Sequence, residues 1–293
     1  MRKYKYIQED VLKQISALTL EIKEKTNGIF SGKHTSWLIG RSLDFLQHRE
    51  YYAGDDIKLI DWKIYGRRDK FFIKQFHQET NLEVNFFIDC SLSMWYPEYS
   101  LTKYEYASFL CSYLSYILLN QNDKVGIIRF DHEIKDILSS SSTEGFYYKI
   151  LEFLENEIKG SHSDFKNLVK KILNQFKKKS LIILISDLIS EDETITVKLL
   201  KNVASYGINL MILHTVCLEE KELDLSYENV KFKDIENEDI EIKTNIVEIK
   251  DLYKMKFSNL INYYNRELNG ENIKYKTIYT FLPVLENLKF ILE

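Results

Sequence analysis

The 293-residue sequence contains little cysteine, proline or glycine: 3 Cys, 2 Pro and 10 Gly. So little proline and glycine excludes a collagen-like chain and a Pro/Gly-rich disordered one. The cysteines, at 90, 111 and 217, are odd in number, far apart and without a CxxC spacing. They therefore indicate neither a disulfide framework nor a thiolate zinc site. The remaining composition, 45% hydrophobic and 29% charged, is that of an ordinary globular protein.

A long apolar run is also missing. No stretch approaches the roughly 18–20 uninterrupted apolar residues that span a bilayer, and serines interrupt the most apolar helical stretch, residues 107–119. Charged residues from Glu9 to Glu21 interrupt any hydrophobic region that a signal peptide would need. We therefore expect no membrane span and a cytoplasmic location.

Neither sign of charge dominates. Lys plus Arg number 40 and Asp plus Glu number 44, so the net charge is 40 − 44 = −4. Because non-specific binding to nucleic acid is largely electrostatic, this balance argues against a protein that mainly holds phosphate backbones. We expect no nucleic-acid partner.

Familiar catalytic motifs are absent from the sequence as well. It has no GxxxxGK[ST] loop, no HExxH, no GxSxG and no GxGxxG. Its six histidines, at 34, 48, 77, 132, 162 and 214, show no spacing typical of metal ligands. We therefore expect no catalytic residues and no organic cofactor.

The pattern of the sequence changes once, near residue 80. Before it, turn, basic and aromatic residues are mixed; after it, short apolar runs alternate with amphipathic stretches. The predicted strands are 82–89, 124–131, 180–187, 208–216 and 273–280. The predicted helices follow Thr102, cover about 144–157 and 165–176, run from about 190 toward Gly207, cover about 257–268, and follow Pro283. This alternation predicts an α/β fold, a doubly wound and mostly parallel sheet with helices on both faces.

Smaller features complete the predicted organisation. Residues 1–80 form an N-terminal segment and residues 81–293 the α/β domain, with a charged hairpin excursion at about 229–247. The short stretch Ser139–Ser142 is predicted to be a polar turn. The pairs Thr102/Glu105 and Ser190/Glu193 have the spacing of a capping box and predict two helix starts.

Polar side chains gather at three predicted strand ends. They are Asp89-Cys90-Ser91-Leu92-Ser93, Ser161-His162-Ser163-Asp164 and Ser186-Asp187. Because ligands of open α/β sheets bind at the carboxyl ends of the strands, we expect these loops to meet at one edge. Hydroxyl and carboxylate oxygens without thiolates suit Mg²⁺, Mn²⁺ or Ca²⁺ rather than zinc. With only two carboxylates, a coordination position remains for water or for a partner's carboxylate.

Other interpretations of these residues stay open at this point. Ser163 is an equally plausible N-cap for the helix that follows it. Asp187 could simply end a strand in solvent, and a D-x-S-x-S sequence arises by chance fairly often. The metal-site interpretation depends on context: the D-x-S-x-S sequence follows a buried strand and precedes a capped helix.

This arrangement, over roughly residues 80–215, resembles the von Willebrand factor A domain. Its metal-ion-dependent adhesion site uses a DxSxS loop, a Thr in a second loop and an Asp in a third. The resemblance implies Asp89, Ser91, Ser93 and Asp187 as metal ligands. In the second loop it implies Ser163, with Ser161 as the alternative, because serine replaces the family's threonine there.

Motifs in the first 80 residues narrow the resemblance. They are His34-Thr35-Ser36, Gly40-Arg41-Ser42-Leu43-Asp44-Phe45, Arg49-Glu50-Tyr51-Tyr52-Ala53-Gly54-Asp55-Asp56, Ile60-Asp61-Trp62 and Arg67-Arg68. Together with Asp234-Ile235-Glu236 and the helix after Pro283, they resemble the bacterial domain-of-unknown-function family 58. Members of this family typically occur beside MoxR-type AAA+ ATPases. The resemblance therefore implies a MoxR-type ATPase, or a client which that ATPase remodels, as the partner.

These observations predict a non-enzymatic adaptor that binds a protein partner through a divalent cation. The main alternative is an Mg²⁺-dependent hydrolase or phosphotransferase that uses Asp89 and Asp187, since oxygen-rich sites also serve phosphoryl chemistry. A metal-free scaffold is the third hypothesis. In the N-terminal segment, Gly54-Asp55-Asp56 is predicted to be a turn, and Asp61 is expected to pair with Arg67 or Arg68.

Overall fold

The computed structural model describes residues 4–15, 17, 45–52, 61, 64, 66, 70–76, 82–97, 100–176, 180–190, 192–223, 229–233 and 241–292. The chain divides into two compact units: Met1–Leu20 with Leu82–Glu293, and Glu21–Asn81. The expected boundary near residue 80 stays a prediction.

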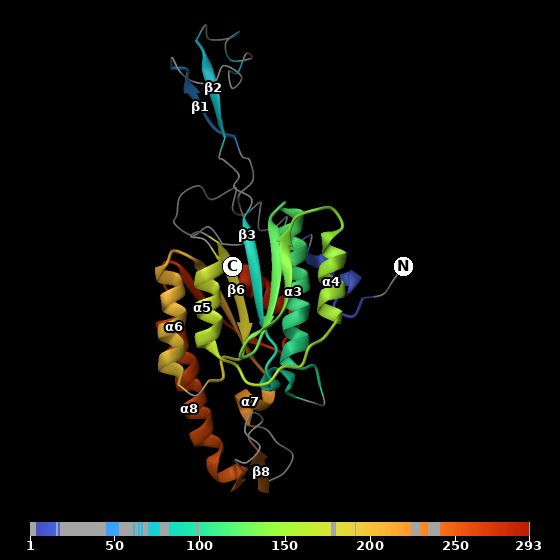
Figure 1. The fold of residues 1–293 in the computed structure, drawn as a ribbon, viewed down its shortest axis with the longest axis vertical. Coiled ribbons are helices and arrows are strands. Elements are labelled where there is room, and N and C mark those ends of the chain that lie inside the picture. The colour runs from blue at the N-terminus through green and yellow to red at the C-terminus, as the bar shows by residue number, and fades with distance from the viewer. Residues whose placement is uncertain are drawn as a thin grey trace. The chain divides into compact units, whose positions relative to one another are not determined.

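The larger unit is built on a six-stranded sheet in the order β10-β7-β6-β3-β4-β5 (Figure 1). Its strands are β3 (Glu83–Asp89), β4 (Lys124–Phe130), β5 (Ile134–Ser141), β6 (Leu181–Ser186), β7 (Asn209–Val216) and β10 (Ile273–Tyr279). Every pairing is parallel except that of β4 with β5. The predicted α/β class, with a mostly parallel sheet, is confirmed.

Helices cover both faces of this sheet (Figure 1). They are α3 (Lys103–Asn120), α4 (Phe146–Glu155), α5 (Phe165–Gln175), α6 (Glu193–Ser205), α7 (Leu218–Glu222), α8 (Ile246–Glu267) and α9 (Val284–Leu292). Helices α4 and α9 pack on α3, and α5 packs on α6. The core between the sheet and α5, α6 and α8 includes Phe165, Val197 and Tyr264. Each residue of β6 is buried, as expected for a parallel strand covered on both faces.

Local sequence explains where α3 begins. The Thr102 side chain accepts a hydrogen bond from the Glu105 N–H, and the Glu105 carboxylate accepts one from the Thr102 N–H. The predicted capping box is therefore confirmed. It satisfies two backbone donors that the first turn of a helix leaves without a partner.

Two local predictions were wrong. The expected polar turn at Ser139–Ser142 lies mostly in β5, an edge strand whose residues alternate between partial burial and exposure. Such a strand has no continuous apolar run, so periodicity does not mark it. The N-cap of α6 is Asp192, whose side chain accepts from the N–H of Thr194 and of Ile195, rather than Ser190.

The predicted charged hairpin is confirmed in its strands. Strands β8 (Asn229–Lys233) and β9 (Glu241–Asn245) pair antiparallel in a separate two-stranded sheet. The last two residues of the predicted hairpin, Ile246 and Val247, belong instead to α8.

The smaller unit contains an antiparallel pair, β1 (Phe45–Glu50) and β2 (Phe72–Phe76). The Asp61 N–H donates to the Phe72 carbonyl at 2.8 Å. The Gly54-Asp55-Asp56 turn, Trp62 and the arginines at 67 and 68 lie outside the described residues. In the described ranges of both units, no helix is long and apolar enough to cross a membrane.

Candidate metal centre

Asp89, at the carboxyl end of β3, is fully buried and accepts hydrogen bonds from the loop after β3, the loop before α5 and the last residue of β6. The Ser163 hydroxyl donates to both carboxylate oxygens at 2.8 Å. The Ser186 hydroxyl donates to Oδ2 at 2.7 Å, and the Ser91 N–H donates to Oδ1 at 2.9 Å. The three strand-end clusters of the sequence therefore converge on one carboxylate.

Neighbouring strands explain this convergence. Strand β3 lies between β4 and β6, and all three run parallel, so their carboxyl ends share one edge of the sheet. After β3, a short 3-10 turn (Leu92–Trp95) places the hydroxyl oxygens of Ser91 and Ser93 at 3.2 Å from each other. Ser93 also hydrogen-bonds to Asp187, which follows β6. All five predicted ligand residues thus belong to one hydrogen-bonded cluster.

Asp187 already has an internal cation. The Lys103 ammonium, at the start of α3, lies 2.8 Å from Asp187 Oδ2 and also pairs with Glu220 of α7. Both Lys103 and Asp187 are buried. Burial opposes both charges, but the ion pair outweighs it: the pKa of Lys103 is raised and the pKa of Asp187 is lowered.

Asp89 has no such partner. Among the described residues, no Lys, Arg or His side chain forms an ion pair with it. Burial, together with the neighbouring Asp187 carboxylate, raises the pKa of Asp89 to about 6. In the described part of the chain, an ionised Asp89 is therefore a buried negative charge that hydroxyls and one N–H stabilise without a cationic side chain.

The residues present fit a hard divalent cation. The donors are two carboxylates and three serine hydroxyls, an all-oxygen set of the kind that Mg²⁺, Mn²⁺ and Ca²⁺ prefer. In the part of the chain that the structure describes, no group of three or more His, Cys, Asp or Glu side chains could hold a metal ion by itself. A cation here would therefore depend on the serines, and it would supply the charge that Asp89 lacks.

The two candidate serines of the second loop have different surroundings. Ser163 contacts Asp89, whereas the N–H and hydroxyl of Ser161 donate to Asp131 Oδ2 at 2.9 and 3.2 Å. The Ser161 hydroxyl also lies 2.9 Å from His132 Nδ1. The geometry favours Ser163 over Ser161 as the residue that serves this centre.

The alternative role of Ser163, as the N-cap of α5, was wrong. The cap is Asp164, whose carboxylate accepts from the N–H of Lys166 at 2.8 Å and of Asn167 at 3.4 Å. The next residue therefore satisfies the helix start, and the Ser163 hydroxyl is left for Asp89.

Sequence reasoning missed Lys103 and Gly160. Lys103 is the first residue of α3, a position where the helix dipole disfavours a cation, and this conflict was a readable signal. Gly160 has no Cβ, and one placed there would lie 2.8 Å from the Cys90 carbonyl oxygen and 2.7 Å from Asp131 Oδ2. The second loop approaches β3 this closely because residue 160 is glycine.

The family described as "Protein of unknown function DUF58" matches residues 47–259. The chain belongs to this family. The resemblance inferred from the spaced motifs is thereby confirmed. The match begins in the smaller unit and includes the β3 loop, the loop before α5 and the end of β6.

Two uncharacterized mycobacterial proteins are similar in sequence over part of their length. They are Rv1480 of Mycobacterium tuberculosis and Mb1516 of Mycobacterium bovis, each 28% identical over 80 residues. That stretch is 27% of this chain and 25% of each relative, so the match spans a quarter of the relatives' length.

Several solved structures align with the chain, and one of them is described as a VWA domain. BatB from Bacteroides thetaiotaomicron is 21% identical with a TM-score of 0.44, covering 72% of this chain and 96% of that one. The VWA domain of SpRpn10 is 14% identical with a TM-score of 0.43, covering 71% and 94%. The mussel byssus protein PTMP1, with a zinc-occupied MIDAS motif, is 12% identical with a TM-score of 0.38, covering 47% and 38%. Each likeness concerns the fold alone.

Proposed function

We propose that this protein is a divalent-cation-dependent adaptor that binds a protein partner. Asp89, Ser91, Ser93, Ser163 and Asp187 hold the cation, Mg²⁺ or alternatively Mn²⁺ or Ca²⁺. The observation that carries the proposal is the buried Asp89 carboxylate, which residues at the ends of β3 and β6 and in the loop before α5 contact. Among the described residues, no Lys, Arg or His side chain forms an ion pair with it.

The donor set also supports binding of an acidic partner. Three of the five donors are neutral hydroxyls, and the Lys103 ammonium already compensates one of the two carboxylates. A bound cation would therefore keep residual positive charge and open coordination positions. A carboxylate from the partner fits both needs, because hard cations prefer oxygen ligands.

Family membership suggests who the partner is. The proposal names a MoxR-type AAA+ ATPase, or a client that it remodels, acting in the cytoplasm. Residues 1–80 would then be a family-specific segment attached to the α/β domain. The competing hypothesis is an Mg²⁺-dependent hydrolase or phosphotransferase that uses Asp89 and Asp187.

The test combines binding with turnover. Calorimetric titration should show Mg²⁺ binding to the wild-type protein and strongly weakened binding to Asp89→Ala. A purified MoxR-type ATPase from the same organism should bind in Mg²⁺, dissociate in chelator and fail to bind Asp89→Ala. Equal Mg²⁺ affinity in both proteins, or a complex indifferent to chelator, would overturn the proposal. Mg²⁺-dependent phosphatase or ATPase turnover that disappears in Asp89→Ala would support the hydrolase instead.

A further inference from the structure

The segment that includes α5 is unusually basic. Residues 165–180 contain six lysines and neither Asp nor Glu, in a chain whose net charge is −4. Three of these lysines, at 166, 170 and 171, lie on α5, and the other three lie outside the described residues. Lys170 is exposed and Lys171 half-buried, and neither forms an ion pair with any described residue.

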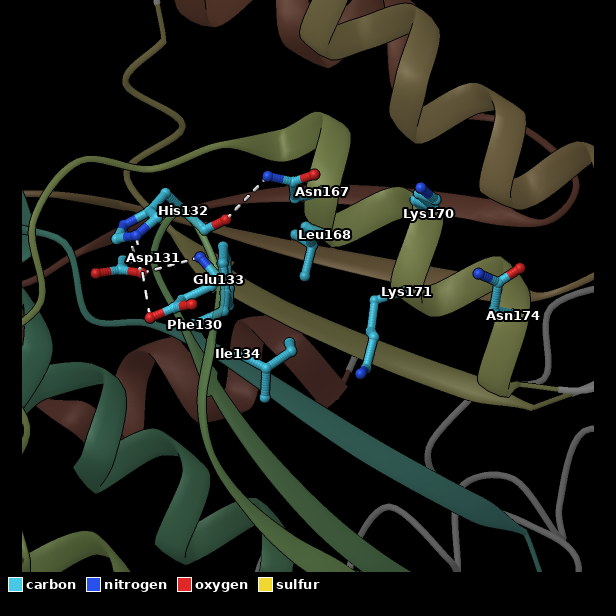
Figure 2. A pocket seen from close by; sticks show the side chains of 10 residues that line it. All are labelled: Phe130, Asp131, His132, Glu133, Ile134, Asn167, Leu168, Lys170, Lys171 and Asn174. Carbon is cyan, nitrogen blue, oxygen red and sulfur yellow. Dashed lines mark hydrogen bonds and ion pairs between the residues drawn. The ribbon is translucent and has the colours of Figure 1, made fainter.

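A pocket of about 380 Å³ lies between α5 and the turn that joins β4 to β5 (Figure 2). Apolar side chains line part of it, Phe130, Ile134 and Leu168 among them. Figure 2 shows the Lys171 side chain extending from α5 along the pocket toward Ile134. A peptide that places an aliphatic side chain in this pocket would therefore bring its adjacent residues within reach of the Lys171 ammonium group.

The two acidic residues of the pocket share one lysine. Asp131 lies 3.2 Å from the Lys135 ammonium and 3.1 Å from His132 Nδ1. Glu133 lies 3.0 Å from the same lysine. With Lys170 and Lys171, three lysines stand against two carboxylates among the described residues at this pocket, a net charge of +1 with histidine neutral. The excess positive charge lies on α5, so the α5 side of the pocket is complementary to carboxylates.

The pocket shares its rim with the metal centre. Asp131 lines the pocket and accepts hydrogen bonds from Ser161 and, through its carbonyl oxygen, from the Asp164 N–H at 3.3 Å. Ser163, which lies between Ser161 and Asp164 in the sequence, contacts Asp89. A polypeptide that places one carboxylate at the metal centre can therefore continue into the pocket beside α5.

We propose that this pocket and the lysine side of α5, together the α5 groove, bind an acidic segment of the protein partner in which carboxylates flank an aliphatic residue. The inference rests on the proposed function, since it names the chemistry of the same partner. Nucleic acid is the less suitable polyanion because the apolar lining favours an aliphatic side chain and offers a phosphate backbone nothing.

The direct test is the affinity of a fluorescent peptide, acetyl-Glu-Glu-Leu-Glu-Glu-amide, for the full chain, measured by anisotropy in Mg²⁺. Reversing both lysines (Lys170→Glu with Lys171→Glu) should weaken binding about tenfold, since several charge pairs of modest strength become repulsive. The matched control is Lys149→Glu, on the exposed side of α4, which should leave the affinity unchanged. A peptide with serine in place of leucine should also bind more weakly, and thermal melting verifies that each variant folds.

The outcomes of these measurements distinguish binding at the α5 groove from binding at the metal centre. Weakening by the lysine reversals but not by chelator or Asp89→Ala supports the groove and overturns the metal-dependent function. Weakening by chelator and Asp89→Ala alone overturns the groove and leaves the metal centre. An oligothymidylate that displaces the peptide at equal charge concentration, or loss of binding in Lys149→Glu, would show general attraction of polyanions and reject the groove.

Discussion

Strands β3 and β4 are neighbours in the sheet, and a buried aspartate stands at the carboxyl end of each, yet their surroundings are opposite. Asp131, after β4, has the Lys135 ammonium at 3.2 Å and accepts from the N–H groups of Glu133 and Ser161. Burial opposes its charge, but these contacts outweigh burial and lower the pKa of Asp131. From the described residues, Asp89 accepts hydrogen bonds from hydroxyls and one N–H without an ion pair, and its pKa is raised to about 6.

The difference separates a structural carboxylate from one available to a ligand. A buried charge is tolerated when it is paired and hydrogen-bonded. Asp131 meets both conditions with residues of this chain, and Asp187 meets them through Lys103. Asp89 is hydrogen-bonded but has no ion-pair partner among the described residues. A bound cation would therefore stabilise Asp89 more than it would stabilise Asp131 or Asp187.

The largest effect is expected from removing the internal cation of Asp187. Lys103→Met would leave Asp187 and Glu220 without their shared ammonium and make Asp187 resemble Asp89. Breaking a buried pair in this way costs about 3–5 kcal/mol, so the free energy of unfolding in chelator should fall by that order. Urea denaturation measures it, with Lys149→Met as the exposed control.

The same variant should respond more strongly to metal. With two uncompensated carboxylates, Mg²⁺ should recover more stability in Lys103→Met than it adds to the wild-type protein, because a ligand that binds the folded state more tightly stabilises it more. An unchanged unfolding free energy in chelator would contradict the ion pair. A smaller Mg²⁺ response than wild type would contradict the role given to Lys103.

The next effect compares the two aspartates directly. Asp89→Ala should weaken Mg²⁺ binding about a hundredfold or more, roughly 2.7 kcal/mol, because the centre loses its uncompensated charge. The fold should survive, since a buried repulsion with Asp187 is removed as well. Calorimetry and thermal melting measure the two quantities.

Asp131→Ala is the matched variant and should show the opposite pattern. Its loss leaves two backbone N–H groups without their acceptor and leaves Lys135 paired with Glu133 alone, so the melting temperature should fall while Mg²⁺ affinity stays within about twofold. Equal losses of Mg²⁺ affinity in both variants would remove the distinction between the two strand ends.

Much of this centre could be predicted from the sequence because the order and direction of the strands bring its residues together. Buried strands ending in polar residues and joined by helices predict a parallel sheet, and the polar ends of neighbouring strands then meet. The ion pair between Lys103 and Asp187 could not be predicted, since it joins residues 84 positions apart and depends on how α3 packs. The serine of the second loop could not be chosen either, because Ser161 and Ser163 have the same chemistry two residues apart.

In the fold, too, some elements could be predicted from the sequence and others could not. Fully buried strands such as β6 were predictable from their apolar runs, whereas the half-exposed edge strand β5 was not. At α6 the sequence offers two caps, Ser190 and Asp192, and spacing alone did not decide between them. Such choices are set by which side chain the backbone turns toward the helix, which periodicity does not encode.

A smaller effect on Mg²⁺ affinity is expected from the two serines of the loop before α5, one of which contacts Asp89 and the other Asp131. Ser163→Ala removes a hydroxyl from Asp89 and should weaken Mg²⁺ binding about tenfold, roughly 1.4 kcal/mol. Ser161→Ala removes a hydrogen bond from Asp131 and should leave Mg²⁺ affinity unchanged. Paired calorimetric titrations measure both, and the reverse pattern would move the centre to Ser161.

The smallest effect concerns the helix start beside Ser163. Asp164→Ala removes the N-cap of α5 and should cost about 1 kcal/mol of stability, because two backbone N–H groups lose their acceptor. Mg²⁺ affinity should be unchanged, since the Asp164 carboxylate bonds to the first turn of α5 and to the Asn167 side chain rather than to Asp89. Asp192→Ala, which removes the corresponding cap of α6, should lose a similar amount and provides the control. If Asp164→Ala instead weakened Mg²⁺ binding as much as Ser163→Ala does, cap and ligand would not be separate, and the loop before α5 would act on the metal centre as one unit.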